Sequence, residues 1–137
     1  MVQLKCTIVT PEATALDRLV DFVALPLFDG EIGIAPGHSP LIGRLGYGEM
    51  RLRDGDAVSR FYLDGGFVQV IDDKISVLTN HAVPADKIDE AAAEEMLRAA
   101  LERDANTPES IEIRDRLVAQ ARGQLRVSRR AREAAHP

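Results

Sequence analysis

Residues 84–104 read PADKIDEAAAEEMLRAALERD, and here the periodicity of the sequence changes from that of strands to that of a helix. Ala, Glu and Leu dominate this stretch and are strong helix formers. Asp86 can cap the first turn, and Asp89 would then occupy the third helical position, where a carboxylate favours the helix. We therefore expect a helix roughly 28 Å long over residues 86–104, at about 1.5 Å per residue.

A second helix is predicted after the break at residues 105–108, which read ANTP. Thr107 is a good N-cap residue, and Pro108 is a good first helical residue. The helix that follows, roughly 35 Å long, carries an apolar stripe at a spacing of four residues, made of Ile113, Leu117, Ala121 and Leu125. Because the connection is short, we expect the two helices to form an antiparallel hairpin.

The seam of this hairpin is expected to be weak. The first helix offers the small side chains of Ala92, Ala99 and Ala100, which allow close approach but bury little apolar area. Gly123 lies inside the second helix and costs it up to about 1 kcal/mol relative to Ala. The hairpin should therefore be marginally held and able to open.

Upstream of Pro84 the pattern is that of short strands. In VQLKCTIV, residues 2–9, apolar and polar side chains alternate. Two hairpins are indicated, with tips at Asp54-Gly55 and at Asp72-Asp73. Strands with turn signals every eight to twelve residues are typical of a β-sandwich or barrel. The fold class is therefore α+β: an antiparallel β-sandwich over residues 1–84 and a helical hairpin over residues 85–137.

Composition excludes several classes of site. The chain has 137 residues, 4 % aromatic residues and one cysteine, so neither an intrachain disulfide nor a cysteine-based zinc site is expected. The three histidines, His38, His81 and His136, lack the spacing of metal ligands. The N-terminus has no apolar core of a signal peptide, and no run of about 18 apolar residues predicts a membrane span.

Charge is distributed unevenly along the chain. The net charge is −5, with 17 Lys and Arg against 22 Asp and Glu. All the positive charge after residue 104 is arginine, which suits bidentate pairing with carboxylates or phosphates. Nucleic acid, membrane and acidic protein are possible partners for such a segment. Because the acidic body would repel a phosphate backbone, nucleic acid is not expected as a partner.

The loop GEIGIAPGHSP, residues 30–40, allows two interpretations. Glu31 and His38 could act as an acid and a base, or the loop could be a stiff contact surface. No nucleophile with the spacing of a known catalytic motif accompanies them. The glycines and prolines are more simply turn-forming and stiffening residues. From its residues alone, the chain is predicted to be a binding module.

Four motifs carry a family resemblance: GEIGIAPGHSPLI at 30–42, YLDGGFVQV at 62–70, KIDEA at 87–91 and GQLRV at 123–127. The chain resembles the epsilon subunit of bacterial F-type ATP synthase, over residues 4–130. The resemblance implies a sandwich of ten strands, a rotor role in the central stalk, and neither catalysis nor a cofactor. It implies contact with the ring of c subunits through Glu31, Gly33, Pro36, Gly37 and His38. It also implies contact of the sandwich with the gamma subunit around Tyr62, Gly65, Gly66 and Val68.

The resemblance also assigns the helical hairpin a regulatory role. When extended, the hairpin would enter the alpha/beta catalytic hexamer and block ATP hydrolysis, with acidic residues of the beta subunits meeting Arg114, Arg116, Arg122 and Arg126. Some family members bind ATP through a motif that here reads Ile88-Asp89-Glu90-Ala91-Ala92-Ala93. Ala92 occupies the arginine position of that motif, so tight ATP binding is not expected.

The implied location is the cytoplasmic face of the bacterial plasma membrane, with membrane association only through the complex. The principal alternative is a stand-alone regulatory binding module with the same fold and another partner. A third hypothesis is a small hydrolase built on Glu31 and His38.

Overall fold

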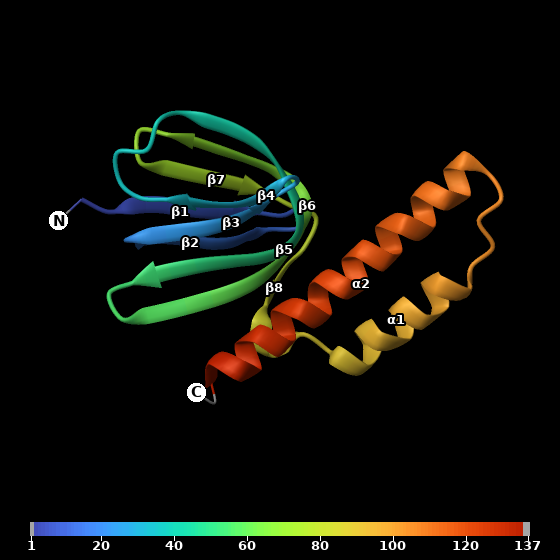
Figure 1. The fold of residues 1–137 in the computed structure, drawn as a ribbon. Helices are drawn as coiled ribbons and strands as arrows, with labels where there is room; N and C mark the ends of the chain where they lie inside the picture. The colour runs from blue at the N-terminus through green and yellow to red at the C-terminus, as the bar shows by residue number, and fades with distance from the viewer. Residues whose placement is uncertain (1, 136–137) are drawn as a thin grey trace.

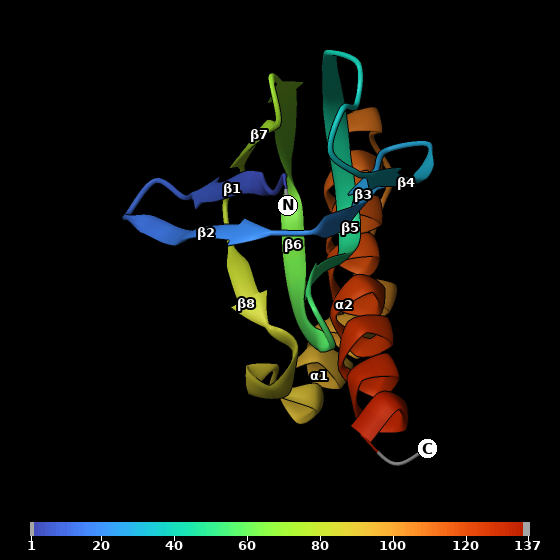
Figure 2. The ribbon, with the colours of Figure 1, turned by 90° about the vertical axis from the view of Figure 1, so that its left-hand side faces the viewer.

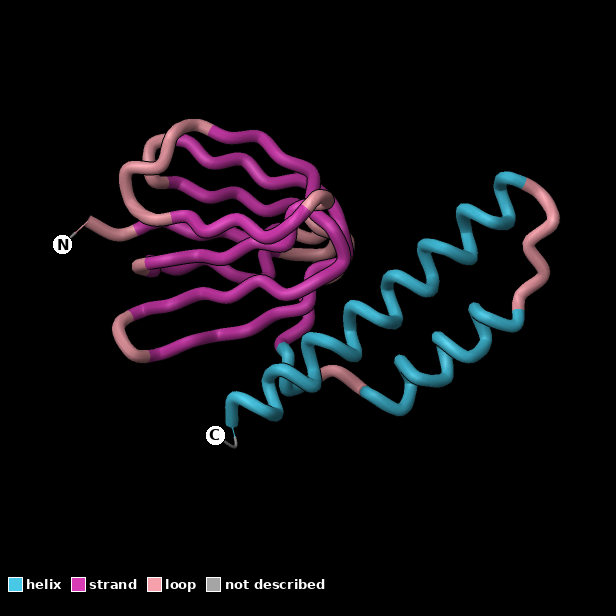
Figure 3. The backbone as a smooth tube through the Cα atoms, in the orientation of Figure 1, coloured by secondary structure: helices cyan, strands magenta, loops and turns pink. Residues whose placement is uncertain are grey.

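The computed structural model describes residues 2–135, so His136 lies outside the described residues. A strand domain is followed by two helices that lie on one side of it (Figure 1, Figure 3). The strands are β1 Leu4–Val9, β2 Thr14–Val20, β3 Phe22–Leu27, β4 Gly30–Ile34, β5 Leu41–Asp54, β6 Ala57–Ile71, β7 Lys74–Leu78 and β8 Ala82–Pro84. A short 3₁₀ turn, η1 Ala85–Lys87, leads to helices α1 Glu90–Glu102 and α2 Pro108–Ala135.

The strands form one hydrogen-bonded sheet of eight strands, in the order β2-β1-β7-β6-β5-β3-β4, with β8 paired to β6. The α+β fold class is confirmed, with two corrections. The sheet is mixed, because β1 pairs in parallel with β7. Residues 2–135 form eight strands rather than ten, because β5 and β6, with 14 and 15 residues, bend without being interrupted. Both predicted hairpin tips join strands as expected, β5 to β6 and β6 to β7.

The bend of β6 lies at Gly65-Gly66, within the motif at residues 62–70. Both glycines have positive φ, 70° and 106°. On one side of them β6 pairs with β8, and on the other side with β7, while β5 follows it along its length. A methyl group built at Gly66 would lie 1.9 Å from the carbonyl oxygen of Leu78. Gly66 therefore allows a close approach of β6 to the backbone at Leu78 that a residue with a side chain would obstruct.

The core is formed inside the folded sheet by sixteen buried side chains. Leu4, Cys6 and Ile8 of β1 all point into it, in agreement with the predicted alternation. Burial raises the pKa of the Cys6 thiol to about 12, so this cysteine is a small core residue rather than a reactive thiol.

The first helix is shorter than predicted, and a different residue caps it. Asp86 lies in the 3₁₀ turn, and Ile88 is extended, so the helical backbone begins only at Glu90. Asp89 is the N-cap, and its Oδ1 accepts a hydrogen bond from the backbone N–H of Ala92 at 3.0 Å. At the second helix, Thr107 Oγ1 accepts from the N–H of Ser110 at 3.1 Å, which confirms the predicted cap.

The seam between the helices also differs from the prediction. Ala93 and Ala100 are the buried alanines of α1, whereas Ala92 and Ala99 are exposed. On α2, Ala121 and Leu125 are buried as predicted, but Ile113 is exposed. Ion pairs reinforce the start of α1, where Glu90 contacts Arg129 and Arg132, and Glu94 contacts Arg129 at 3.2 Å. No helix within residues 2–135 is long and apolar enough to span a membrane.

The bend of β6 makes a testable prediction with a matched control. Gly66→Ala should lower the free energy of unfolding by about 3 kcal/mol or more, because it combines positive φ with a backbone clash. Gly55→Ala at the β5–β6 tip shares the positive φ, 62°, but meets nothing within 4 Å. Gly55→Ala should lower the free energy of unfolding by only about 1 kcal/mol. Urea unfolding of the two variants compares them, and equal losses would contradict the role given to Gly66.

Candidate functional site

The loop after β4 is held in place by hydrogen bonds. The N–H of His38 donates to the carbonyl oxygen of Ala35 at 3.2 Å, which closes a tight turn. The N–H of Gly37, whose φ is 85°, donates to Asp73 Oδ1 at 2.7 Å. This bond ties the turn to the β6–β7 hairpin, and Pro36 stiffens it further. The expectation of a stiff loop agrees with this geometry.

Glu31 and His38 engage different partners. The Glu31 carboxylate forms a bidentate ion pair with Arg51, at 2.7 and 3.1 Å. These bonds hold the pKa of Glu31 below its ordinary value. His38 Nδ1 lies 2.8 Å from the carbonyl oxygen of Ser39. A general acid or base near neutral pH needs a raised rather than a lowered carboxyl pKa, so this arrangement disfavours the hydrolase hypothesis.

The five residues predicted to contact the c ring lie in two places. Glu31 and Gly33 belong to β4, an edge strand of the sheet, whereas Pro36, Gly37 and His38 form the turn beyond it. A methyl group built at Gly33 would lie 2.7 Å from the ring of Phe22, so this glycine makes room for an aromatic side chain.

The residues predicted to contact the gamma subunit are mostly interior. Tyr62 and Val68 are each 1 % exposed, and Gly65 is buried as well. The sheet surface available to a partner is instead formed by their outward neighbours. Phe67 and Leu78 are directly paired and are 59 % and 54 % exposed, and Val9 pairs with Leu78. We call Val9, Phe67 and Leu78 the outer patch. Alternation along β6 could have revealed Phe67. Val68 and Val70 point inward, so Phe67 and Gln69, which alternate with them, point outward.

The second helix docks on β5 and β6 of the sheet (Figure 2). The contact includes Tyr62 and Asp64 of β6. The Tyr62 hydroxyl donates to Asp64 Oδ1 at 2.8 Å, and Gln120 Nε2 of α2 donates to the same oxygen at 3.1 Å. Burial and the Asp64 carboxylate raise the pKa of Tyr62. The apolar part of this contact is smaller than the sandwich core: Tyr62, Ala85 and Val127 are buried in it, and Tyr47, Val83, Ile88 and Ala131 pack around them partly buried. Polar groups therefore contribute much of the docking.

Gly123 has a different role from the one predicted. A methyl group built there would lie 2.8 Å from the carbonyl oxygen of Tyr47 and 3.1 Å from the ring of Tyr62. The glycine therefore lets α2 approach the sheet closely. Its low helix propensity is offset by a contact that the sequence alone does not reveal.

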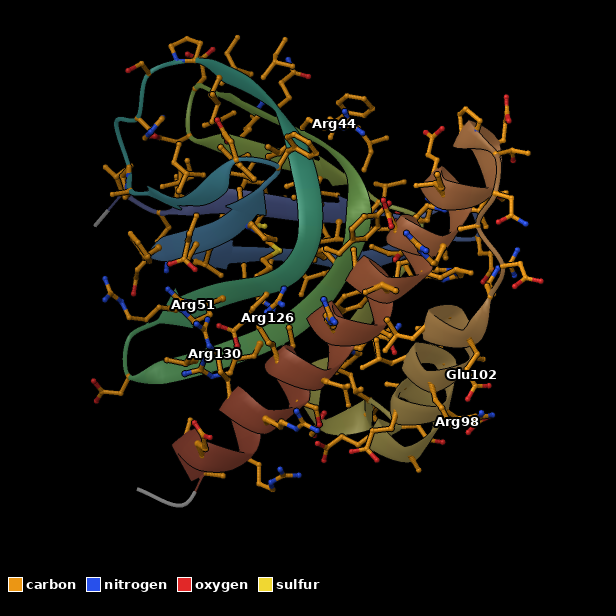
Figure 4. All side chains as sticks on the ribbon, turned by 45° about the vertical axis from the view of Figure 1, so that its right-hand side comes forward. Arg44, Arg51, Arg98, Glu102, Arg126 and Arg130 are labelled. Atoms are coloured by element: carbon orange, nitrogen blue, oxygen red, sulfur yellow. The ribbon has the colours of Figure 1, made fainter. Side chains whose placement is uncertain are left out.

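A buried carboxylate gathers arginines from both parts of the chain. The Glu49 side chain is 3 % exposed and accepts from Arg51 at 3.0 Å and from Arg60 at 3.1 Å. Arg130 of α2 lies 3.8 Å from it. Figure 4 shows Arg51 and Arg130 side by side where α2 crosses the strands. This cluster, missed from the sequence, joins residues far apart in the chain, so no local spacing signals it.

The four arginines assigned to the catalytic hexamer are in different environments. Arg114 contacts Asp115 at 3.4 Å, and Arg116 is exposed. Arg122 and Arg126 line a groove of about 450 Å³ between α2 and the β3–β4 turn. Within residues 2–135, neither of these two has a carboxylate oxygen within 4.0 Å.

The remaining motif residues have structural roles. Asp89 caps α1, Ile88 packs beside Tyr62 and Ala85, and Ala92 is exposed. No group of three or more metal-ligating side chains occurs in the part of the chain that the structure describes.

Gly123→Ala tests the close approach of α2. The new methyl group should weaken docking, because its clash with the Tyr47 backbone outweighs a helix gain of up to about 1 kcal/mol. Amides of residues 118–128 should exchange hydrogen several-fold faster, while those of the sandwich core do not change. Arg116→Ala, an exposed change on the same helix, is the control for helix propensity. Slower exchange in Gly123→Ala would contradict the role of the glycine.

Comparison with known proteins identifies the family. Residues 3–85 match the family described as ATP synthase, Delta/Epsilon chain, beta-sandwich domain. The chain is 52 % identical over 126 residues to the ATP synthase epsilon chain of Rhodopirellula baltica, which covers 92 % of this chain and 98 % of that one. The epsilon chain of Granulibacter bethesdensis is 39 % identical over 101 residues, 73 % of this chain and 75 % of that one.

Two solved structures have the same fold. One is a chain in the Euglena gracilis mitochondrial ATP synthase, OSCP/F1/c-ring, with a TM-score of 0.74 and 22 % identity over 99 % of this chain and 83 % of that one. The other is in the Tetrahymena thermophila mitochondrial ATP synthase, central stalk and c ring, with a TM-score of 0.74 and 13 % identity over 93 % and 97 %. The prediction from the four sequence motifs is confirmed: the chain belongs to the delta/epsilon family of ATP synthase, as a non-catalytic subunit of the epsilon type.

Proposed function

We propose that the chain couples rotation of the c ring to the gamma subunit in the central stalk of a bacterial F-type ATP synthase, and that its helices inhibit ATP hydrolysis. It would act at the cytoplasmic face of the plasma membrane, attached only through the complex. The observation that carries this proposal is the contrast between two interfaces. Among the described residues, sixteen side chains are buried in the sandwich core, whereas the apolar cluster beneath α2 has three buried and four partly buried residues, supplemented by polar contacts.

This contrast suits a rotor part with a movable brake. The sandwich can transmit torque because its core and its hydrogen-bonded turns resist deformation. The hairpin can leave the sandwich without exposing a large apolar surface, so its docked and released states lie close in free energy. Within residues 2–135, neither Arg122 nor Arg126 has a carboxylate oxygen within 4.0 Å in the docked state, and Arg126 donates to the carbonyl oxygen of Tyr47 at 3.5 Å. Both guanidinium groups could therefore pair with acidic residues of the catalytic hexamer.

The contact surfaces follow from exposure. We assign the outer patch to the gamma subunit, because it is an apolar sheet surface that includes Phe67, the exposed apolar residue of the motif at residues 62–70. We assign Glu31 and the turn Pro36–His38 to the c ring, on account of their rigidity and polar character. Tight ATP binding is not part of the proposal, since Asp89 already caps α1 and Ala92 offers no cation.

The outer patch predicts a loss of binding to gamma. The double variant Phe67→Ser/Leu78→Ser should weaken binding to isolated gamma subunit about ten-fold or more, because it removes two exposed apolar side chains whose burial would favour binding. The matched control is Leu19→Ser/Val58→Ser, which removes two side chains of similar exposure elsewhere on the sandwich. Surface plasmon resonance compares the two. Equal affinities would remove the outer patch from the proposal.

The brake is tested by a titration. The chain is added to an alpha-beta-gamma complex that lacks this subunit, and ATP hydrolysis is followed. We expect a saturable fall near one chain per complex, lost on truncation after Pro84. Retention of the fall after truncation would exclude the hairpin as the brake. Failure of the chain to co-migrate with the complex on a native gel would exclude the central-stalk assignment and favour a stand-alone binding module.

A further inference from the structure

Two arginines from different parts of the chain compete for one oxygen atom. Glu49 Oε1 lies 3.0 Å from Arg51 Nη1 and 3.8 Å from Arg130 Nη1. The other oxygen, Oε2, is already bonded to Arg60 at 3.1 Å. Glu49 is almost fully buried, and its two carboxylate oxygens must satisfy three arginines. Any change that strengthens the Arg51–Glu49 bond therefore weakens the hold of Glu49 on Arg130.

Arg51 donates hydrogen bonds to two carboxylates, those of Glu31 and Glu49. Its Nη1 donates to Glu49 and also to Glu31 Oε2, at 3.0 and 3.1 Å, and its Nη2 donates to Glu31 Oε1 at 2.7 Å. The Glu31 side chain is about half exposed, whereas that of Glu49 is not. Glu31 is therefore the end of the cluster that another molecule can reach.

We propose that Glu31 is the exposed end of an ion chain, Glu31–Arg51–Glu49–Arg130, through which a cationic side chain of a partner at the β4 edge loosens the docked second helix. The partner group that fits is a lysine or an arginine, because the exposed end of the cluster at this edge is the carboxylate of Glu31. The inference rests on the proposed function in one respect: that function places another subunit against Glu31.

The sign of the effect follows from the charges. The cluster holds two carboxylates, Glu31 and Glu49, and three arginines, Arg51, Arg60 and Arg130. A cation that occupies Glu31 releases Arg51 to Glu49, where it displaces Arg130. The cation also cancels the direct attraction between Glu31 and Arg130, which contributes to the lowered pKa of Glu31. Both effects act against docking of the last turns of α2.

Thermodynamic linkage adds a consequence in the other direction. If a cation at Glu31 weakens the docking of α2, release of α2 must strengthen binding of that cation by the same factor. A ring contact at β4 and an extended hairpin would then favour each other. The docked hairpin would correspond to a weaker contact at this edge.

The experiment uses the isolated full chain and two thiols. Val127→Cys places a thiol in the seam between α2 and the sheet, where Val127 is 1 % exposed and packs near Tyr62 and Ala85. The native Cys6, buried in the sandwich core, reports opening of the sandwich in the same molecule. Labelling with iodoacetamide is followed by peptide mass spectrometry, so the two rates are measured together.

Glu31→Lys, which places a cation at the end of the chain, should raise the labelling rate at position 127 about five-fold, and Glu31→Gln about two-fold, as expected for ion pairs at a partly exposed site. The rate at Cys6 should not change. Glu12→Lys, at an exposed site in the β1–β2 turn, makes the same charge change and should leave both rates unaltered. In an Arg130→Gln background, Glu31→Lys should have no further effect.

Three outcomes would overturn the inference: an unchanged rate at position 127, a parallel rise at Cys6, or an equal effect of Glu31→Lys in the Arg130→Gln background. Hydrogen exchange at amides 124–132 in chains that retain Val127 gives the same comparison if the cysteine variant misfolds. These measurements need no other subunit. A failure here therefore leaves the rotor assignment intact, and a failure of the titration with the catalytic complex leaves the ion chain intact.

Discussion

The close approach of Gly66 to the backbone at Leu78 is the constraint on which the rest of the structure depends. Gly65 and Gly66 bend β6, so that β6 pairs with β7 on one side of the bend and with β8 on the other. The bend folds the sheet over its own apolar face and so creates the core. It also places Tyr62 and Asp64 at the surface on which α2 docks. The sandwich, the core and the seat of the helix thus share one origin.

The two interfaces of the molecule differ in their physical character. The sandwich interior is apolar and closely packed, so opening it would expose many buried side chains to water. The contact between α2 and the sheet combines close packing at Gly123, hydrogen bonds from Gln120 and the ion pairs of Glu49. Polar contacts of this kind exchange for water at little net cost when the helix leaves. A rigid body with a releasable arm is the natural result of this division.

Charge connects the two parts in a way that composition does not reveal. The arginines after residue 104 form a basic segment in an acidic chain, yet they divide into groups with different functions. Arg129 and Arg132 bind the start of α1, and Arg130 reaches Glu49. Arg122 and Arg126 line a groove and, within residues 2–135, have no carboxylate oxygen within 4.0 Å. Only their positions around the helix, relative to the sheet, distinguish them.

The sequence by itself determined the fold class, the hairpin tips, the cap at Thr107 and the family, because these depend on local periodicity, turn chemistry and contiguous motifs. It misplaced the start of α1, since whether Asp86 or Asp89 caps the helix depends on how η1 packs. Tertiary structure alone decided that Tyr62 and Val68 face inward, that Gly123 serves close approach, and that Glu49 joins β5 to α2. Each of these depends on contacts between residues far apart in the chain, whose geometry is set by the bend of β6 and has no counterpart in local spacing.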